Sequence, residues 1–427
     1  MMLIWRSIDR LLPRGEPKYT NRLFTNRLLL GYASTMYRHL IASLSFATLI
    51  AAACWAAAPP ATPAAAPAAP PAMPIPSAPQ VDARSYILVD YKTDKILAAK
   101  DAAARMEPAS LTKLMTAYIV FQELAGGKLK LEDMVTVSEH AWRSEGSRTF
   151  IELGKPVTVQ DLILGMIVQS GNDATIALAE RIAGTEDTFA QLMNSNAKRL
   201  NMVGTHFENS SGLPSPQHYT TARDMSLLAN AMIRDFPQYY KYYSIREFEH
   251  NGIKQQNRNG LLEKDPSVDG LKTGHTDSAG FCLVTSAHRE GMRLVSVVLG
   301  STSMKARENA SAALLSYGFT FYDTKLAVKG GIALATTRVW KAAQSPDEVG
   351  IKDDLYVTLA RGQADVRTAV DLRPKLIAPL GLDADVGTLR VFSGTTPLAT
   401  LPLHPLKPVA AGGWWRRLID TIRLWFA

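Results

Sequence analysis

An almost unbroken run of alanine and proline occupies residues 58–80 and limits where a hydrophobic core can form. Such a composition buries no core and favours an extended polyproline conformation. We therefore predict that residues 58–81 are a linker and that folded structure begins near Asp82. The whole chain has 427 residues, which exceeds the usual size of a single domain. We therefore expect two folded domains after the linker.

An apolar segment over residues 40–58 precedes the linker and follows a short basic lead at residues 36–39. It ends in small residues, as secretory signal peptides do, and we predict that residues 1–57 are a leader and signal peptide. The true start is predicted at Met36, with a long native leader or a signal anchor as the alternative. Export to the periplasm follows from this prediction.

The two cysteines are divided between the predicted signal peptide and the folded part of the chain. Cys54 lies in the signal peptide, so the mature protein is expected to contain Cys282 alone and no intramolecular disulfide. Ala51 occupies the position where lipobox sequences usually carry a large aliphatic residue, which argues against a lipid anchor on Cys54.

The net charge of +8 is carried by the two ends of the chain. Residues 1–57 contribute +5 and residues 405–427 contribute +3, which leaves the middle of the chain close to neutral. Nucleic-acid binding requires a basic face on a folded domain, so no nucleic-acid partner is expected. The sequence also lacks a P-loop, a dinucleotide fingerprint and a His/Cys metal spacing, and we predict neither cofactor nor metal.

The apolar pattern after Asp82 changes between strand-like and helix-like periods, which predicts an α/β fold of the α+β kind. It should combine antiparallel strands of one sheet with core helices. The predicted elements are a β-hairpin (86–89 with 95–98), a core helix (108–124), a second helix that opens at Thr158 and stops at Ser170, and two antiparallel strands (281–287 and 292–300).

After Tyr322 the pattern changes to short strand-like segments, such as residues 355–359, 367–370 and 388–392, and residues 324–408 are predicted to form a small all-β sandwich domain. Residues 409–427 are predicted to end in an amphipathic helix. Gly412 and Gly413 should detach this helix from the β-domain, and its terminal aromatics favour a membrane surface as its partner. Its apolar side holds Trp415, Leu418, Ile419, Ile422, Trp425 and Phe426, and its polar side holds Arg416, Arg417, Asp420 and Arg423.

Ser110 and Lys113 are three residues apart in the first predicted helix, which places both side chains on one face. A serine hydroxyl needs an adjacent base to act as a nucleophile, and a lysine with a lowered pKa can supply that base. Burial and a second cation such as Lys272 would lower the pKa. The spacing alone is weak evidence, because a capping serine near a solvated lysine is common on helix surfaces.

Ser170 and Asn172 flank Gly171 where the second predicted helix breaks, and we expect them in a loop facing a cleft. Ser170 can relay a proton to a leaving amine. The amide of Asn172 can hold both Lys113 and a substrate carbonyl, because it combines a donor and an acceptor. An ordinary turn is the alternative explanation of this motif.

Lys272, Thr273 and Gly274 stand at the start of a predicted strand. Gly274 has no side chain to obstruct a peptide laid along the strand edge, and Lys272 and Thr273 can hold a terminal carboxylate. The backbone N–H groups of Ser110 and His275 are candidates for an oxyanion hole. A solvated edge lysine is the alternative, but the three motifs in this order favour one active site.

The three motifs, S-x-x-K, S-x-N and K-T-G, are the signature of class A β-lactamases and penicillin-binding proteins. Residues 82–322 resemble the type-5 low-molecular-mass penicillin-binding proteins, and the β-rich segment with its terminal helix is also that family's arrangement. The resemblance is carried by residues 108–113 (PASLTK), 169–174 (QSGNDA), 257–262 (NRNGLL) and 269–276 (DGLKTGHT).

The resemblance implies a transpeptidase/β-lactamase-like catalytic domain over residues 82–323, with an antiparallel sheet and a helical subdomain. It also implies a D-alanyl-D-alanine carboxypeptidase activity on peptidoglycan stem peptides. It implies β-lactam antibiotics as further ligands, and peripheral attachment to the outer face of the cytoplasmic membrane through the terminal helix. The implied site residues are Ser110 as the acylated nucleophile, Lys113 as its base, Ser170 and Asn172 as the relay, Lys272 and Thr273 at the carboxylate, Gly274 and His275 along the cleft, and Arg223 and Arg307 as further carboxylate contacts.

Other functions of the same motifs stay open at this point. A muropeptide endopeptidase of the same fold would cut the crosslink instead of the terminal residue. A serine β-lactamase shares the motifs, but class A enzymes use an additional glutamate, and a β-domain with a terminal helix would be superfluous in a freely diffusing enzyme. A non-catalytic wall-binding protein is expected to have lost Ser110 or Lys113, and both are present.

Overall fold

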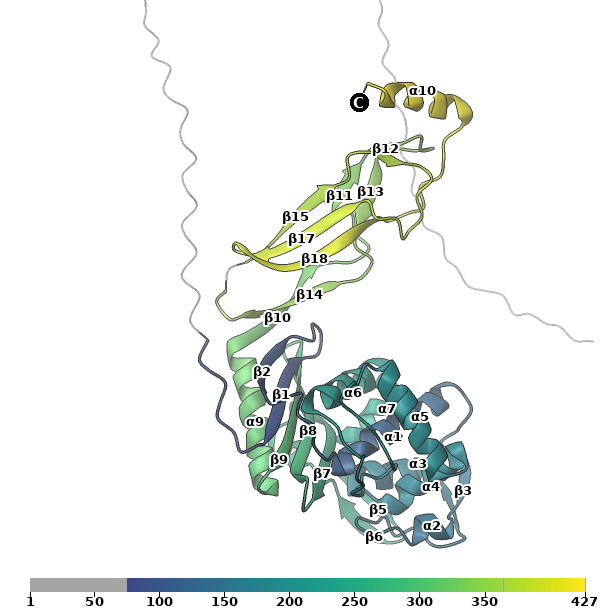
Figure 1. Cartoon of the computed structure of the whole chain (residues 1–427), viewed down its shortest axis with the longest axis vertical. Helices are drawn as coiled ribbons and strands as arrows, with labels where there is room; N and C mark the ends of the chain where they lie inside the picture. The colour runs from purple at the N-terminus through teal and green to yellow at the C-terminus, as the bar shows by residue number, and fades with distance from the viewer. Residues whose placement is uncertain (1–74, 364, 427) are drawn as a thin grey trace, which may run out of the picture. The chain divides into compact units, whose positions relative to one another are not determined.

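The computed structural model describes residues 75–363 and 365–426 (Figure 1). The predicted leader, the signal peptide and most of the predicted linker lie outside these residues. An α/β part comes first in the chain. Its elements are β1 (Ser85–Asp90), β2 (Ile96–Lys100), η1 (Ala109–Thr112), α1 (Lys113–Ala125), β3 (Met134–Thr136), α2 (Glu139–Trp142), β4 (Pro156–Thr158), α3 (Val159–Leu164), η2 (Gly165–Gln169), α4 (Asn172–Ala183), α5 (Glu186–Arg199), α6 (Ala222–Asp235), α7 (Pro237–Tyr240), η3 (Lys241–Ser244), β5 (Glu247–His250), β6 (Ile253–Gln256), α8 (Leu261–Lys264), β7 (Val268–Thr276), β8 (Gly280–Arg289), β9 (Met292–Ser301) and α9 (Met304–Phe321).

A five-stranded antiparallel sheet with the order β2-β1-β9-β8-β7 forms the centre of this part. The predicted hairpin is confirmed as β1 and β2, and the predicted neighbours are confirmed as β8 and β9. The position of the K-T-G motif was predicted wrongly: Lys272 and Gly274 lie in the middle of β7, not at the start of a strand. Since β7 is the last strand of the sheet, this motif faces the helical subdomain from a sheet edge.

Both faces of the sheet are covered, with α9 on one side and the helical subdomain on the other (Figure 1). Leu88 of β1 joins the core under α9, whereas its neighbour Ile87 joins the core under the helical subdomain. Successive side chains of a strand point to opposite faces, so a strand covered on both sides needs an apolar or paired residue at every position. All six residues of β1 are buried accordingly.

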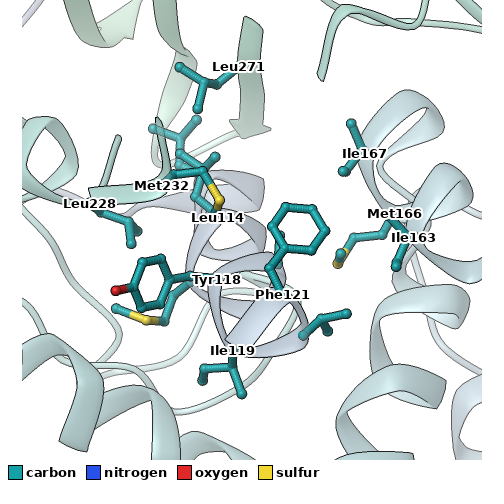
Figure 2. Packing of buried hydrophobic residues seen from close by; sticks show 14 of the residues in the cluster. Leu114, Tyr118, Ile119, Phe121, Ile163, Met166, Ile167, Leu228, Met232 and Leu271 are labelled. Atoms are coloured by element: carbon teal, nitrogen blue, oxygen red, sulfur yellow. The ribbon is translucent and has the colours of Figure 1, made fainter. Parts of the chain in front are cut away.

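Helix α1 runs through the middle of the helical subdomain and confirms the predicted core helix (Figure 2). Its Leu114, Tyr118 and Phe121 pack against Met232 of α6 and Ile163 of α3 in one core cluster. The preceding turn, Ala109–Thr112, is a 3-10 helix that carries Ser110. The nucleophile candidate therefore stands at the entrance of a helix that is fixed by packing on all sides.

The second predicted helix is also confirmed, including its first and last residues. Thr158 caps α3 by accepting a hydrogen bond from the backbone N–H of Asp161 at 3.1 Å. The helix continues as a π-helical turn, Gly165–Gln169, and ends at Ser170 in the left-handed conformation. Only Gly171 separates Ser170 from α4, so Asn172 begins a helix and does not lie in the loop that we predicted.

The second part of the chain is all-β, as predicted, and is packed around its own hydrophobic cluster. A five-stranded sheet has the order β11-β13-β18-β17-β15, and β10 pairs with β14. The predicted strand segments near 355, 367 and 388 correspond to β14, β15 and β17. The elements are β10 (Tyr322–Val328), β11 (Ala335–Thr337), β12 (Val339–Trp340), β13 (Asp347–Gly350), β14 (Leu355–Ala360), β15 (Val366–Leu372), β16 (Leu376–Ile377), β17 (Gly387–Ser393) and β18 (Thr396–Pro405).

The chain ends in helix α10 (Trp414–Leu424), which is amphipathic as predicted. The glycines before it do not detach it: the N–H of Gly412 donates to the carbonyl of Lys341 at 2.7 Å. Asp420 is buried, and its carboxylate accepts hydrogen bonds from the N–H of Lys341 and from Arg338. The polar side of α10 therefore contacts the β-domain. Within the described residues, no helix is both long enough and apolar enough to cross a membrane.

Candidate active site

A cavity of about 540 Å³ brings residues of all three motifs together beside the edge strand β7. Among the described residues that line it, none is acidic. The predicted residues Lys113, Asn172 and Lys272 are not in its lining, and each is buried. The lining residues are Ser110, Gly146, Ser147, Ser170, Arg258, Thr273, Gly274, His275, Phe281, Met304 and Arg307.

Lys113 is buried to 1% exposure, and its ammonium group donates three hydrogen bonds. Its Nζ lies 3.0 Å from Ser110 Oγ, 2.6 Å from Asn172 Oδ1 and 2.6 Å from the carbonyl oxygen of Ser211. Three acceptors satisfy all the donors of an ammonium group. The predicted contacts of Lys113 with Ser110 and Asn172 are therefore confirmed, and the lysine is held in a single orientation toward the serine.

Burial, and after it the neighbouring guanidinium of Arg258, lower the pKa of Lys113 from its ordinary value to about 7. Glu186 and Asp173 act in the opposite direction. We had predicted that Lys272 would be the second cation. Burial holds the pKa of Lys272 well below its usual range, and the neighbouring Lys113 lowers it further, but Lys272 is not among the groups that shift the pKa of Lys113. Arg258, which stays charged, is the cation that acts on Lys113.

Ser170, in the cavity lining, has an unusual backbone conformation and an unusual side-chain environment. It has a φ of 66°, although it is not glycine, and its hydroxyl is buried. Within the part of the chain that the structure describes, this hydroxyl has no hydrogen-bond partner. Strained backbone and unpaired buried polar groups cost free energy and concentrate at functional sites. Ser170 is therefore a candidate functional residue in the lining of the cavity.

Asn172 links the motif to a loop over the cavity. Its Nδ2 donates to the carbonyl oxygen of Glu145 at 2.5 Å, while its Oδ1 accepts from Lys113. Because the amide nitrogen has two hydrogens, one remains for a substrate carbonyl. Asp173, the next residue, is buried and accepts backbone N–H groups from Thr149 and Phe150, which fixes the same loop.

Gly274 lines the cavity, and its missing side chain has a further consequence besides the one that we predicted. A Cβ atom at this position would lie 3.1 Å from the carbonyl oxygen of Pro108 and 3.2 Å from the backbone nitrogen of Ser110. The missing side chain therefore lets β7 approach the turn that carries Ser110. It brings the N–H groups of the turn and of the strand close together, as a pair of oxyanion donors requires.

The neighbours of Gly274 on β7 meet the cavity in different ways. Thr273 and His275 line it, and the imidazole of His275 stacks on Phe281 with ring centroids 3.9 Å apart. Lys272 is buried, and its Nζ donates to the carbonyl of Thr273 at 3.0 Å. The K-T-G strand thus combines a buried lysine behind the cavity wall with a hydroxyl and an aromatic ring that line the cavity.

Sequence analysis missed Ser211 and Gly212. The carbonyl of Ser211 is the third acceptor of Lys113, and Gly212 has a φ of 89°. A Cβ atom on Gly212 would lie 1.8 Å from the carbonyl oxygen of Ala109, so only glycine fits there. Ala109 itself has a φ of 47°, directly before the nucleophile candidate. A Ser-Gly pair is too common to signal such a contact.

Arg258 and the predicted Arg307 line the cavity, whereas Arg223, which we also predicted, lies elsewhere. Arg307 donates to the carbonyl oxygens of Gly274 and Arg258 at 3.3 Å. Arg223 is exposed on α6 and is not among the lining residues. No group of three His, Cys, Asp or Glu side chains suited to a metal occurs in residues 75–363 and 365–426.

A serine beside a buried lysine of lowered pKa, in a cationic cavity at the edge of an antiparallel sheet, is typical of serine acyl-transfer hydrolases. The chain belongs to the D-alanyl-D-alanine carboxypeptidase family, whose model matches residues 73–303. A second model, the C-terminal domain of penicillin-binding protein 5, matches residues 321–411. The protein is thus a serine-type D-Ala-D-Ala carboxypeptidase and a penicillin-binding protein.

Similar proteins come from distant bacteria. The D-alanyl-D-alanine carboxypeptidase DacA of Escherichia coli is 42% identical over 361 residues, which cover 82% of this chain and 90% of that protein. DacF of Bacillus subtilis is 32% identical, covering 81% and 90%. Penicillin-binding protein 5 of Haemophilus influenzae has a solved structure with a TM-score of 0.75 and 39% identity, covering 78% of this chain and 99% of that chain.

Proposed function

We propose that this enzyme removes the terminal D-alanine from peptidoglycan stem peptides through an acyl-enzyme on Ser110. The observation that carries the assignment of Ser110 is its contact with Lys113, whose Nζ lies 3.0 Å from Ser110 Oγ. A lysine with a pKa of about 7 is partly neutral at neutral pH and can accept the serine proton. A solvated lysine would be protonated and unable to act as a base.

Acylation proceeds in two proton transfers. Neutral Lys113 takes the proton of Ser110 Oγ, which attacks the carbonyl carbon of the penultimate D-alanine. The N–H groups of Ser110 and His275 stabilise the developing oxyanion. Ser170 then passes a proton from Lys113 to the leaving nitrogen, the peptide bond breaks, and D-alanine departs with its carboxylate.

Deacylation reverses these roles with water. The same base, acting through Ser170, takes a proton from a water molecule, whose oxygen attacks the ester carbonyl. The ester bond to Ser110 Oγ then breaks, the serine recovers its proton, and the shortened stem peptide leaves with a new carboxylate. Asn172 keeps Lys113 in place throughout.

The terminal carboxylate of the substrate is bound by the cationic end of the cavity. Thr273, Arg258 and Arg307 line this end, and Lys272 lies directly behind Thr273. A carboxylate accepts charge-assisted hydrogen bonds from guanidinium and hydroxyl groups together. Penicillins carry both a carboxylate and a strained amide, so they acylate Ser110 as substrate mimics.

The test is to incubate the purified chain with a diacyl-Lys-D-Ala-D-Ala tripeptide and follow free D-alanine, with Ser110→Ala as the matched control. Release by the wild type alone supports the proposal. Release by Ser110→Ala contradicts the assignment of the nucleophile. Penicillin acylation of Ser110 without D-alanine release indicates a muropeptide endopeptidase, and rapid penicillin turnover indicates a β-lactamase.

Membrane attachment and export complete the proposal: the domain order is a leader with a signal peptide, a linker, the catalytic domain, the β-domain and a helix on the outer face of the cytoplasmic membrane. The support is the exposure of the apolar side of α10, where Trp425 is 79% exposed and Phe426 is 88% exposed. Aromatic side chains at a helix end favour the membrane interface. Co-sedimentation of the full chain with lipid vesicles, compared with a chain ending at Pro408, tests this attachment.

A further inference from the structure

We propose that the cavity between α10 and the β-domain binds the phosphodiester headgroup of an anionic phospholipid. The cavity has a volume of about 710 Å³. Its lining includes Arg338 from the β-domain and Trp415, Arg416, Ile419, Asp420 and Arg423 from α10. The inference rests on the proposed membrane attachment and adds to it a defined site with a preferred lipid.

Charge is the first argument for this site. Three arginines and one aspartate line the cavity, which leaves a surplus of positive charge. The carboxylate of Asp420 is already engaged, since it accepts from the N–H of Lys341 at 2.7 Å and from Arg338 at 3.3 Å. Asp347, another carboxyl group that interacts with Arg416, is not among the lining residues. An anion is therefore the ligand that this cavity favours.

The chemistry of the arginines indicates which kind of anion the cavity favours. A guanidinium group has five N–H donors in a planar fork that matches the oxygen pair of a phosphate. Arg416 donates one hydrogen bond to the carbonyl of Ala343, at 2.8 Å, and Arg338 donates one to the carboxylate of Asp420. The remaining donors of these two residues and of Arg423 border the cavity from both elements. A phosphodiester offers two charged oxygens that can be shared among them.

The apolar part of the lining distinguishes a lipid from a free phosphate. Trp415, Ile419, Val339 and Pro346 border the same cavity as the arginines. An inorganic phosphate has no group that contacts apolar side chains. A phospholipid carries its phosphate next to glycerol and acyl chains, which suits a cavity that is cationic and apolar at once.

The contact of Asp420 sets the orientation of the helix. Asp420 is only 6% exposed, whereas Trp414, at the start of the same helix, is 63% exposed. The buried carboxylate holds the polar side of α10 against the β-domain, so the arginines border the cavity together with Trp415 and Ile419, while Leu418 and Ile422 stay exposed. Arg417 lies on the same helix but does not line the cavity, and it provides a matched control of equal charge.

The experiment measures binding of the full chain to vesicles of phosphatidylcholine alone and of phosphatidylcholine mixed with phosphatidylglycerol. One surface arginine near an anionic membrane accounts for a loss of about fivefold, which we expect for Arg417→Gln. Charge-assisted hydrogen bonds to a bound phosphate account for more, and we expect Arg423→Gln to weaken binding to the mixed vesicles by about 10–100-fold. Circular dichroism of both variants checks that the fold is unchanged.

A second experiment measures lipid binding in the absence of a bilayer. Dihexanoyl-phosphatidylglycerol below its micelle concentration, dihexanoyl-phosphatidylcholine and inorganic phosphate are titrated into the full chain by calorimetry. Saturable binding of the phosphatidylglycerol, lost in Arg423→Gln and kept in Arg417→Gln, supports the site. Equal losses in both variants, or inorganic phosphate binding as tightly as the lipid, overturn it. Lipid titration without vesicle binding would instead contradict membrane attachment and leave the site standing.

Discussion

The role of Arg258 can be tested through the pH dependence of catalysis. Lys113 has a pKa of about 7 in the folded protein against an ordinary value of 10.5, a difference of about 5 kcal/mol in favour of the neutral amine. Burial causes most of this difference, and Arg258 is the largest cationic contribution. Replacing Arg258 by glutamine removes a neighbouring positive charge and must raise the pKa of Lys113.

The expected rise is about half to one unit, because a like charge near a partly shielded group contributes roughly 1 kcal/mol. The measurement is kcat/KM for D-alanine release against pH, whose acid limb reports the base of the free enzyme. The wild-type limb should have its midpoint near pH 7, and the Arg258→Gln limb should lie higher. Loss of carboxylate binding lowers the plateau of the variant but does not move the limb.

Arg390→Gln is the matched control, since Arg390 lies in the β-domain and pairs with Asp371. It removes the same charge from the chain without changing the cavity, so its limb should coincide with that of the wild type. An Arg258→Gln limb that stays in place or moves to lower pH would refute the reasoning. A wild-type limb near the ordinary lysine pKa would contradict the lowered pKa of Lys113.

Further predictions concern the supports of the site. Burial lowers the pKa of His218 from 6.5 to about 4, so between these pH values the unfolded chain binds more protons than the folded chain. The free energy of unfolding, measured in urea, should therefore fall by about 3 kcal/mol as the pH drops from 6.5 to 4. His218→Asn should flatten this pH dependence. Gly212→Ala should abolish penicillin acylation seen by mass spectrometry, because its Cβ would lie 1.8 Å from a carbonyl oxygen, whereas Gly252→Ala, also at positive φ but in open space, should leave acylation unchanged. Asp173→Asn should lower the free energy of unfolding by about 1–3 kcal/mol and slow D-alanine release, since the buried carboxylate accepts N–H groups of the loop over the cavity; unchanged values for both would contradict that role.

Local patterns explain which features the sequence could predict. The cap at Thr158 and the spacing of Ser110 and Lys113 depend on neighbours within one helical turn, and both were predicted correctly. The strand β1 was found by its apolar run. The K-T-G motif was placed at a strand start because a strand buried on both sides shows no alternation that marks where it begins.

Contacts between distant segments explain what was missed. The carbonyl of Ser211 meets Lys113 across 98 residues of sequence, and a backbone acceptor leaves no trace in residue identity. Arg258 was quoted only as part of a motif, because nothing local tells an arginine that lines a cavity from a solvated one. The burial of Asp420 against the β-domain likewise depends on Lys341, far away in the chain.

The departures from local rules at the site share one consequence. Ala109 and Ser170 have φ values of 47° and 66°, and the Ser170 hydroxyl is buried without a partner among the described residues. Each feature costs about 1–3 kcal/mol in a fold whose total stability is typically about 5–15 kcal/mol. A right-handed Ser170 or a solvated Lys113 would relax the site, but the first would move the Ser170 side chain from its place in the cavity lining and the second would separate Lys113 from Ser110. The two cores on either face of the sheet supply the stability that keeps these groups in place, so a substitution that relaxes the site should stabilise the fold while it weakens catalysis.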